Sequence, residues 1–577
     1  MKKKLNILII GLGVLLLSVS CDLDKVPLAT LSPDTYFSNE EELRLYSNKF
    51  YEDILPEASD IYNDYGDAVI ETPLNTAISG QRTVPATGGG WSWSALRRIN
   101  YLLQNSHQTT NEEVRNRYDA LAKFFRAYFY FEKLKRYGEV PWFNEVLGST
   151  DEDLFKPRDS RSLIADSILR DLDYAIQYLP KEKNVYKINK WTAHALKSRV
   201  GLFEGTFRKY HGLNDAEKYL NASVEASEEL MNNGGYSLYT NGSTPYKDLF
   251  ATTDAIGQEV ILARDYNKEL NLLNDVQNFE NSSSKGRPGL SKSFVNTYLM
   301  SSGSRFTDLS NYNEKEFVEE VQNRDPRLAQ TIRTPGYTRM GGSRVSPNLS
   351  HSMTGYHLIK YTMEPVYDGH NSSITDMPIF RIAEVYLNFA EAKAELGTLT
   401  QADLDKSINL IRARVSMPAL NLTQANSNPD PYLSDAETGF PDVSGENQGV
   451  VLEIRRERGI ELVLEGHRYY DIMRWKAGKR FEKDFNGMYF SRLGDFDLDG
   501  NGTIDICLYQ GTKPSSSASL FMEVGSDIVL SEGTKGLIVA HGNINRVFDE
   551  DKDYFYPIPS EEINLSDNTL KQNPGWK

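Results

Sequence analysis

Cysteine is nearly absent from this sequence, which contains only Cys21 and Cys507 among its 577 residues. The N-terminal pattern described below predicts that Cys21 is acylated, and Cys507 then has no partner for a disulfide bond. A secreted chain without disulfides must be stabilised by its hydrophobic core. A chain of this length can bury a core large enough for that.

Positive charge is also scarce, because 64 Lys and Arg residues face 80 Asp and Glu residues, for a net charge of −16. Nucleic-acid binding requires a basic face, so this balance excludes nucleic acid as the expected partner. It also argues against a polybasic contact with a membrane surface.

Enzyme motifs are missing as well. After Cys21 the sequence contains no phosphate-binding loop, no HExxH zinc motif and no GxSxG nucleophile elbow. The eight histidines are scattered, and none has the spacing of metal ligands. Although glycosidase carboxylates leave weak signatures, these absences favour a binding protein that requires no cofactor over an enzyme.

The N-terminus has the pattern of a secretory signal peptide over residues 1–20. Lysines at positions 2–4 precede an apolar run from Leu5 to Leu17, which is too short to span a bilayer comfortably. Small residues at 18–20 then lead to Cys21 and resemble a lipobox, although the expected leucine is one position early. We predict an acylated Cys21 that anchors the chain in lipid. The alternative is an ordinary signal peptide with an incidental cysteine.

Helical periodicity dominates residues 21–232, which we treat as the N-terminal part of the chain. Apolar residues at spacings of three and four predict helices near 33–55, 96–103, 112–137, 160–179, 190–209 and 214–232. Small residues such as Gly201 lie among larger apolar ones, which permits close contact between helices. Consecutive helices with short turns resemble degenerate tetratricopeptide repeats. Residues 56–92 are expected to form a loop.

Residues 233–577 are more irregular and form the second part, expected to pack on the first as one globular unit. Residues 233–375 are rich in Gly, Ser, Asn and Tyr, and a long irregular stretch on a helical scaffold usually carries function. The pattern predicts short helices near 291–300 and 313–322, longer helices near 383–397, 402–415 and 449–477, a loop at 418–448 and a β-like run at 536–540. The predicted fold class is therefore mainly α.

Five segments in order resemble the SusD/RagB family of outer-membrane nutrient-binding lipoproteins. They are the mature start at 21–37, NRDPRL at 323–328, RIAEVYL at 381–387 with AEA at 390–392, RRER at 455–458 with further matches up to Trp475, and YPIP at 556–559 with NPG at 573–575.

The resemblance implies a protein that captures oligosaccharide on the outside of the outer membrane. It further implies delivery to a SusC-like TonB-dependent transporter, without chemistry on the ligand. Peptide capture is the main alternative, because some members of the family serve peptide uptake. A glycoside hydrolase and a helix-repeat scaffold are more distant alternatives.

Paired carboxylates on one predicted helix need a separate interpretation. Glu457, Glu461 and Glu465 are spaced by four residues, which is compatible with a glycosidase acid and nucleophile. Several arginines lie within one or two helical turns, so ion pairing on or between helices explains the pattern better. These arginines are Arg455, Arg456, Arg458 and Arg468.

Loop aromatics are the candidate sugar contacts, because an aromatic face packs on the CH face of a pyranose while polar side chains bind its hydroxyls. As the resemblance implies, glycan is bound by exposed aromatics of the N-terminal loop and the middle region. The alternative is that these aromatics pack loops onto helices. The candidates are Trp91, Trp93, Tyr62, Tyr65, Arg82, Tyr298, Tyr337 and Tyr356.

An acidic loop at 495–505 is the candidate metal site. Alternating carboxylates with glycines let a short loop surround Ca²⁺ with oxygens, and from Asp497 the first nine positions match a calcium loop. The expected bidentate glutamate is missing, because Leu508 occupies its position. The alternative is a turn stabilised by its own backbone. The candidate ligands of a structural calcium ion are Asp495, Asp497, Asp499, Asn501 and Asp505.

Overall fold

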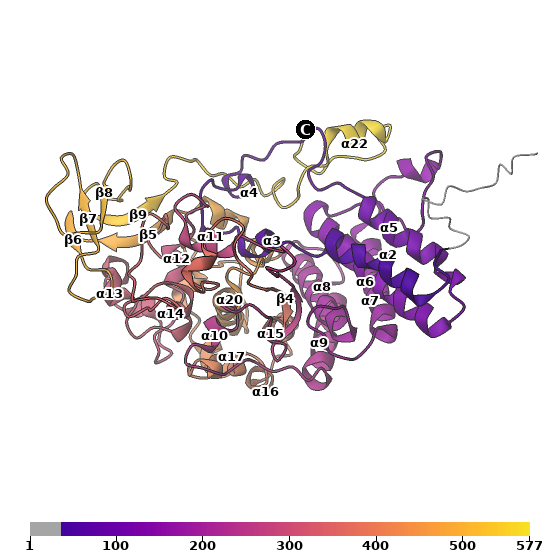
Figure 1. Cartoon of the computed structure of the whole chain (residues 1–577), viewed down its shortest axis with the longest axis horizontal. Coiled ribbons are helices and arrows are strands. Elements are labelled where there is room, and N and C mark those ends of the chain that lie inside the picture. Colours follow the sequence, from indigo (N-terminus) through magenta and orange to yellow (C-terminus); the bar gives the residue numbers. More distant parts are fainter. Residues whose placement is uncertain (1–35) are drawn as a thin grey trace, which may run out of the picture.

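The computed structural model describes residues 36–577, so the predicted signal peptide and Cys21 lie outside the described residues. Figure 1 shows the N-terminal helices on the right and the loop-rich second part on the left. The fold is mainly helical with few short strands, as the sequence predicts. Within the described part, none of the helices combines the length and apolar character needed to cross a membrane.

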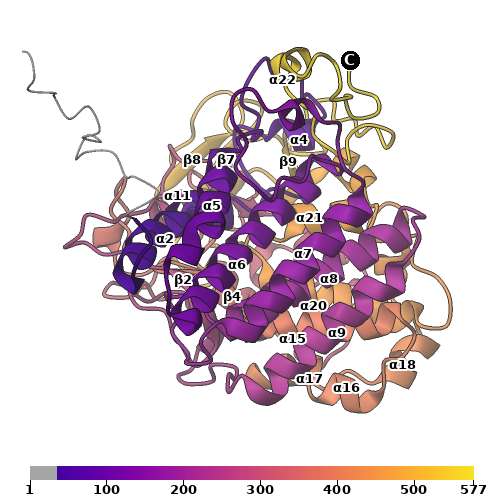
Figure 2. The ribbon, with the colours of Figure 1, turned by 90° about the vertical axis from the view of Figure 1, so that its right-hand side faces the viewer.

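The N-terminal part is a stack of helices in which neighbours along the chain pack together, as the tetratricopeptide-like pattern predicts (Figure 2). Short helices occupy the connections between the longer ones. The long helices are α2 (Glu40–Ile54), α5 (Ser94–Asn105), α6 (Glu112–Tyr137), α7 (Arg161–Tyr178), α8 (Lys190–Tyr210) and α9 (Ala216–Asn233), and the short ones are α3 (Ala58–Tyr62), α4 (Thr76–Ser79), η1 (Ser106–Gln108) and η2 (Glu152–Phe155).

Local sequence explains both the ends and the close packing of these helices. The Asn111 side chain accepts hydrogen bonds from two backbone N–H groups in the first turn of α6, and Gly138 ends that helix at a positive φ of 75°. Helices α8 and α9 approach closely at Gly201, where an added Cβ would lie 2.7 Å from the backbone nitrogen of Ser223. The predicted role of small residues in close helix contact is therefore confirmed.

The middle of the chain consists of short elements joined by long irregular segments, as predicted. Many of its large side chains are nevertheless fully buried, so this region is part of the core rather than an exposed insertion. Its elements are α10 (Pro245–Asp248), β2 (Val260–Arg264), α11 (Val276–Asn281), β3 (Gly289–Leu290), α12 (Lys292–Val295), η3 (Phe306–Asp308), η4 (Tyr312–Glu314), α13 (Phe317–Glu320), α14 (Pro326–Thr331) and η5 (Pro365–Tyr367).

The C-terminal elements return to the N-terminal stack, because α15 packs against α8, α9 and α20. One hydrophobic cluster extends from Phe37 to Leu570 and includes residues of both parts. The helices are α15 (Ile382–Glu395), α16 (Gln401–Asp405), α17 (Ile408–Arg414), α18 (Leu422–Ser427), α19 (Pro431–Ser434), α20 (Gln448–Leu462), α21 (Arg468–Arg474), η6 (Gly478–Glu482) and α22 (Ser560–Leu565).

Several element predictions are wrong in detail. The helix expected at 402–415 is divided into α16 and α17, and the loop expected at 56–92 contains the short helices α3 and α4. The single helix expected at 449–477 is divided into α20 and α21, because Leu464 and Gly466 adopt positive φ angles of 65° and 74° between them. The loop expected at 418–448 contains the short helices α18 and α19. Periodic apolar residues continue through the 463–467 break, so sequence periodicity alone does not detect it.

The strands form small sheets, of which β1 (Val69–Ile70), β3, β2 and β4 (Met377–Arg381) are largely buried. Strand β1 pairs with β3, and β2 pairs with β4, both antiparallel. Strand β9 (Gly536–Ala540) coincides with the predicted run and pairs antiparallel with β5 (Phe485–Phe490). A three-stranded sheet at the left of Figure 1 has β7 (Ile506–Tyr509) between antiparallel β6 (Gly494–Phe496) and parallel β8 (Leu520–Glu523).

Candidate functional site

The carboxylates of α20 form a buried ion-pair cluster. Glu461 is completely buried, and its carboxylate contacts the guanidinium groups of Arg414 at 2.6 Å and Arg381 at 2.7 Å. Glu457 is equally inaccessible and pairs with Arg412 at 2.7 Å and Arg327 at 2.9 Å. The predicted ion pairing of these two glutamates is therefore confirmed, because both are buried and paired with arginines.

The arginines that neighbour these glutamates in sequence have other partners. Arg456 pairs with Asp430, and Arg458 pairs with Asp471 at 2.7 Å. Arg468 pairs with Asp67 at 2.6 Å and so connects α21 to the N-terminal loop. The sequence therefore predicts correctly that these residues form ion pairs, but it does not predict which residues pair. Side chains on one helix point in different directions and meet different elements.

Three candidate sugar-contacting tyrosines are buried, which corrects their assignment. Tyr298 and Tyr356 have no exposed surface, and the Tyr356 hydroxyl donates to the Glu320 carboxylate at 2.8 Å. Tyr62 is also buried, with its ring 4.9 Å from that of Phe279. These rings pack the loops onto the helices, so none presents a face to a ligand in this structure.

Arg82, Tyr65 and Tyr337 have different surroundings from the buried tyrosines. Arg82 is buried against the C-terminal segment, where it pairs with Asp553 at 3.0 Å and lies over the Tyr556 ring. Its ion pair makes it a structural residue, which corrects its assignment as a sugar contact. Tyr337 is half-buried, and burial raises its pKa to about 12.

Tyr65 lines a polar groove of 520 Å³ between the helices α6 and α8 and the junction of α20 with α21. Some of the charges on its walls are paired, whereas Asp60, Asp64 and Arg136 have no ion pair within 4.0 Å among the described residues. Lys135 contacts Glu132 at 2.7 Å, and Arg199 contacts Glu384 at 2.7 Å. The groove therefore places Tyr65 beside charged side chains of α6 and α8, whereas Trp91 and Trp93 line a different pocket.

Trp91 and Trp93 do lie together, in a pocket of 360 Å³ between α5 and α22 that we call the tryptophan pocket. Their ring centroids are 5.4 Å apart with the planes nearly perpendicular. Trp91 is only 5% exposed, because its ring also packs on Tyr137 at 4.8 Å. Trp93 is half-buried and packs on Phe143 at 5.5 Å. The prediction that both rings face solvent is therefore wrong for Trp91.

The walls of the tryptophan pocket are mainly apolar. Exposed Phe155 and Leu565 line its mouth. The Asn100 side chain donates to the backbone carbonyls of Phe143 and Glu145, at 3.0 and 3.3 Å, so this amide is already engaged. The pocket therefore offers apolar contact area and few free hydrogen-bond donors.

A second pocket, of 210 Å³, combines aromatic and polar groups, and we call it the Asn296 pocket. Residues far apart in sequence meet here, from the N-terminal loop, the middle region and the C-terminal part. Helix α12 and strand β5, which border it, lie in the left half of Figure 1, whereas α5 and α22 lie on the right. Its lining includes Asp67, Lys292, Ser293, Asn296, Tyr312, Asn313, Tyr432, Arg480, Lys483, Asp484 and Asn486.

Asn296 is the polar centre of this pocket and is only 4% exposed. Its side-chain NH₂ donates to the Asn313 side-chain oxygen at 3.1 Å and to the Tyr432 hydroxyl at 3.5 Å. Its own Oδ1 is buried and has no hydrogen-bond partner among residues 36–577. A buried acceptor without a donor is costly, and Asn296 lines this pocket.

Two tyrosines border the same pocket. The rings of Tyr312 and Tyr432 are 6.1 Å apart and perpendicular, with Tyr312 the more exposed. Sequence reasoning missed both, although it selected Tyr298, which is two residues beyond Asn296. Which tyrosines of this region are buried depends on its irregular fold, and the sequence does not reveal that fold. A sequence signal that could have pointed to this pocket is the adjacent pair Tyr312 and Asn313.

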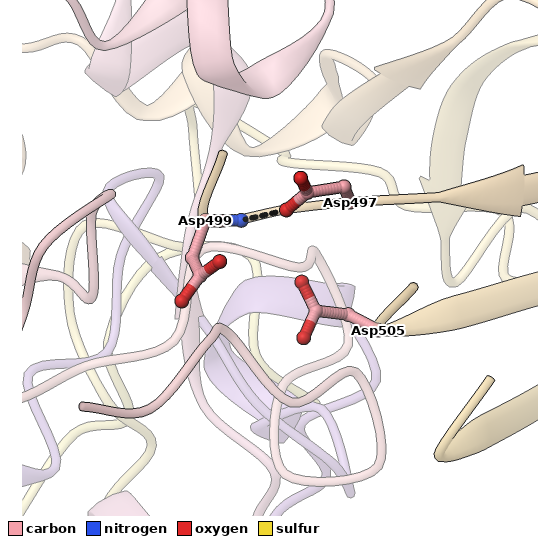
Figure 3. Close-up of side chains that lie close together, drawn as sticks. All are labelled: Asp497, Asp499 and Asp505. Atoms are coloured by element: carbon pink, nitrogen blue, oxygen red, sulfur yellow. Dashed lines mark hydrogen bonds between the residues drawn. The ribbon is translucent and has the colours of Figure 1, made fainter. Parts of the chain in front are cut away.

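The acidic loop brings together three of its five predicted ligands. Asp497, Asp499 and Asp505 each offer a carboxylate oxygen, and these atoms all lie within 4.8 Å of one another (Figure 3). Asp495 is not part of this group, because its carboxylate accepts a hydrogen bond from Ser516 at 2.6 Å. Asn501 donates to the Asp499 carboxylate at 3.0 Å.

The same carboxylates also stabilise the loop backbone. Asp497 accepts backbone N–H bonds at 2.7 Å from both Gly500 and Gly502. Partial burial opposes ionisation, but these N–H groups outweigh it and lower the pKa of Asp497. Asp499 is additionally paired with Arg344 at 3.1 Å. The donor set fits a hard cation, and the backbone bonds fit the alternative turn interpretation.

Comparison with known proteins places the chain in a family. The pattern of the SusD family matches residues 249–576, and a pattern described as "Starch-binding associating with outer membrane" matches residues 92–202. SusD-like protein P25 of Formosa agariphila is 23% identical over 545 residues, which cover 82% of this chain and 90% of that protein. SusD-like protein P2 of the same organism is 21% identical, over 98% of each chain.

Solved structures share the fold. A SusD-like protein from Bacteroides fragilis superposes with a TM-score of 0.69 at 23% identity, covering 96% of this chain and 100% of its own. A SusD-like carbohydrate binding protein from the same species gives a TM-score of 0.68 at 20% identity, covering 93% and 99%. Because the SusD family pattern matches more than half of the sequence, this chain belongs to the SusD/RagB family.

Proposed function

We propose that this protein captures oligosaccharide at the outer membrane and delivers it, chemically unchanged, to a SusC-like TonB-dependent transporter. Membership of the SusD family supports binding as the activity. The single observation that carries the proposal is the Asn296 pocket, where a buried unpartnered acceptor lies beside two tyrosine rings. Sugar binding combines stacking on aromatic rings with hydrogen bonds to hydroxyls, and this pocket holds both kinds of group.

The tryptophan pocket is the second proposed contact for glycan. Trp93 keeps part of its indole accessible beside Phe143, which provides a surface for the CH face of a sugar. The pocket has few free donors, so we assign it stacking rather than recognition of hydroxyls. A long glycan that reaches both pockets gains affinity at each.

Binding of the mature chain to a panel of oligosaccharides, followed by titration calorimetry with the best ligand, tests the proposal. Tyr312→Ala should weaken affinity by roughly five- to a hundred-fold, about 1–3 kcal/mol, because the stacking face is lost. Tyr312→Phe is the matched control and should bind nearly as well as the wild type. Trp93→Ala and Trp93→Phe form the corresponding pair for the tryptophan pocket.

Two outcomes contradict the proposal. If peptides bind and no oligosaccharide does, the protein is a peptide-capture member of the family. If the best glycan is shortened during incubation with the wild-type protein, the ligand is transformed and the protein is an enzyme.

The proposed transporter partner requires a separate experiment. Affinity purification of the wild-type protein from solubilised native outer membranes should recover a TonB-dependent transporter in near-equal amount. Recovery of the protein without any such transporter, under conditions that preserve other outer-membrane complexes, overturns this part of the proposal.

A further inference from the structure

The polar groove that Tyr65 lines has the size of a ligand site. Its volume of 520 Å³ lies within the roughly 300–1,000 Å³ typical of small-molecule sites. Its walls come from α3 and the loop after it, from α6 and α8, and from the junction of α20 with α21. It shares no lining residue with the tryptophan pocket or the Asn296 pocket, so it is a cavity that the two proposed glycan contacts do not use.

Tyr65 contributes an aromatic ring that other side chains leave partly uncovered. Two neighbouring tyrosines of the groove already lie beneath cations, because the Arg136 guanidinium is 3.8 Å from the Tyr556 ring centroid and the Lys135 ammonium is 4.2 Å from that of Tyr470. Tyr65 is half-buried, and among residues 36–577 no cation or second aromatic ring stacks on it. Its ring is therefore available to stack on a ligand.

Arg136 is a cation of the groove that lacks a carboxylate partner. It is half-buried and has no ion pair within 4.0 Å among the described residues. Burial opposes its charge, but the phenols of Tyr470 and Tyr556 outweigh burial and raise the pKa of Arg136. The guanidinium therefore stays charged and can donate hydrogen bonds to the oxygens of a ligand.

Two carboxylates without an ion pair line the same groove. Asp64 is 2% exposed, and its two oxygens accept the backbone N–H groups of Leu464 at 2.8 Å and Arg468 at 3.1 Å. Asp60 is exposed, and its Oδ2 accepts the backbone N–H of Glu57 at 3.0 Å. The Oδ1 of Asp60 has no such bond within the described part of the chain. Asp60 is thus held in place by the protein and keeps one oxygen for a ligand.

The opposite signs of these charges restrict the class of ligand. An anion that pairs with Arg136 is opposed by Asp60 and Asp64, and a cation that pairs with Asp60 is opposed by Arg136. A sugar hydroxyl is both donor and acceptor, so different hydroxyls of one oligosaccharide can accept from Arg136 and donate to Asp60. A peptide with two charged ends also matches both signs, but desolvating those ends costs more than desolvating hydroxyls.

We infer that this groove is a further glycan site, in which a sugar ring stacks on Tyr65 and its hydroxyls bond to Arg136 and Asp60. The inference rests on the proposed glycan-binding function and adds a site to the two proposed contacts. Because Arg136 and Asp60 are already fixed by contacts within the protein, little side-chain freedom is lost when a sugar binds.

Titration calorimetry with the best di- or trisaccharide of the panel tests the inference. The mature Tyr312→Ala, Trp93→Ala double variant lacks both other proposed contacts, so we expect the binding that remains to belong to the groove. Adding Tyr65→Ala to the double variant should weaken this residual binding roughly tenfold or more, because the stacking face is lost. Adding Asp60→Asn instead should weaken it severalfold, because a charged acceptor is lost.

Each of these substitutions has a control in the same double variant. Tyr178→Ala removes an exposed tyrosine from α7, and Glu225→Gln removes an exposed negative charge from α9, both outside the groove. Neither should change the residual affinity. Equal melting temperatures for the Tyr65 and Tyr178 variants would show that a loss of affinity is not caused by unfolding.

The possible failures are distinguishable. If the wild type binds the oligosaccharide and the double variant does not, or if Tyr65→Ala leaves the residual binding intact, the groove inference is overturned while the glycan-binding function stands. If a peptide binds the double variant in a Tyr65-dependent way and the oligosaccharide does not, the groove serves peptide and the inference is wrong. If no oligosaccharide binds the wild type, the inference and the proposed function both fail.

Discussion

At the scale of single residues, Glu461 is fully buried among the guanidinium groups of Arg327, Arg381 and Arg414. Glu461→Gln should destabilise the fold by roughly 3–5 kcal/mol, because three buried arginines lose one carboxylate and only Glu259 is then shared by Arg381 and Arg414. Chemical denaturation measures this loss, with Glu225→Gln as an exposed control that should change stability by less than about 0.5 kcal/mol. The folded variant should bind glycan normally, and loss of a hydrolytic activity with retained affinity would identify Glu461 as catalytic instead.

The same residue predicts a dependence of stability on pH. Burial alone would raise the pKa of Glu461, but the charges of Arg414, Arg381 and Arg327 outweigh it and lower the pKa to about 2. An unfolded glutamate has a pKa of about 4.5, so the unfolded chain takes up this proton first as the pH falls. Stability worth about 3 kcal/mol is present above pH 4.5 and is lost towards pH 2. Denaturation between these values should show a shallower decline for Glu461→Gln than for the wild type.

Among the elements, the junction between α20 and α21 depends on a single glycine. Gly466 has a φ of +74°, and a Cβ added there would lie 2.9 Å from the backbone oxygen of Asp60. Gly466→Ala should therefore cost about 1–2 kcal/mol for the left-handed conformation and more for the contact. Gly212→Ala is the matched control, because Gly212 has a φ of +69° with no atom near its added Cβ. Equal losses of stability in the two variants would show that the contact with Asp60 carries no cost.

The acidic loop after β6 is the second element that allows a sharp test, and we propose that it binds a structural calcium ion. Calcium should raise the melting temperature and EDTA should lower it, because a ligand that binds only the folded state stabilises it. The Asp497→Ala, Asp499→Ala double variant should lose this response. Asp495→Ala should keep it, because Asp495 lies outside the carboxylate group. A purified protein without calcium and without a thermal shift would leave the backbone-stabilised turn as the explanation.

For the whole molecule, location depends on the N-terminal segment, which lies outside the described residues. We propose that acylated Cys21 holds the protein at the outer face of the outer membrane. Cys21→Ala should leave it in the soluble fraction, and wild-type cells should expose the protein to added protease. If the variant still fractionates with outer membranes, the lipid anchor is not what holds it there.

Sequence patterns determined the parts of this protein that depend on neighbours along the chain. Helix α6 matches its prediction from Glu112 to Tyr137, because Asn111 and Gly138 are local signals for its ends. Strand β9 is likewise encoded within a few residues. The ordered family segments also fixed the family, since they depend only on the sequence.

Tertiary structure alone decided which side chains meet and which remain accessible. Tyr298 and Tyr312 belong to the same irregular region, yet one is fully buried and the other borders a pocket. Glu461 meets arginines that are distant in sequence, and Asn296 meets Tyr432 from a different helix. Burial and pairing of this kind depend on contacts between segments far apart in the chain. The periodicity or spacing of residues within one segment therefore does not predict them.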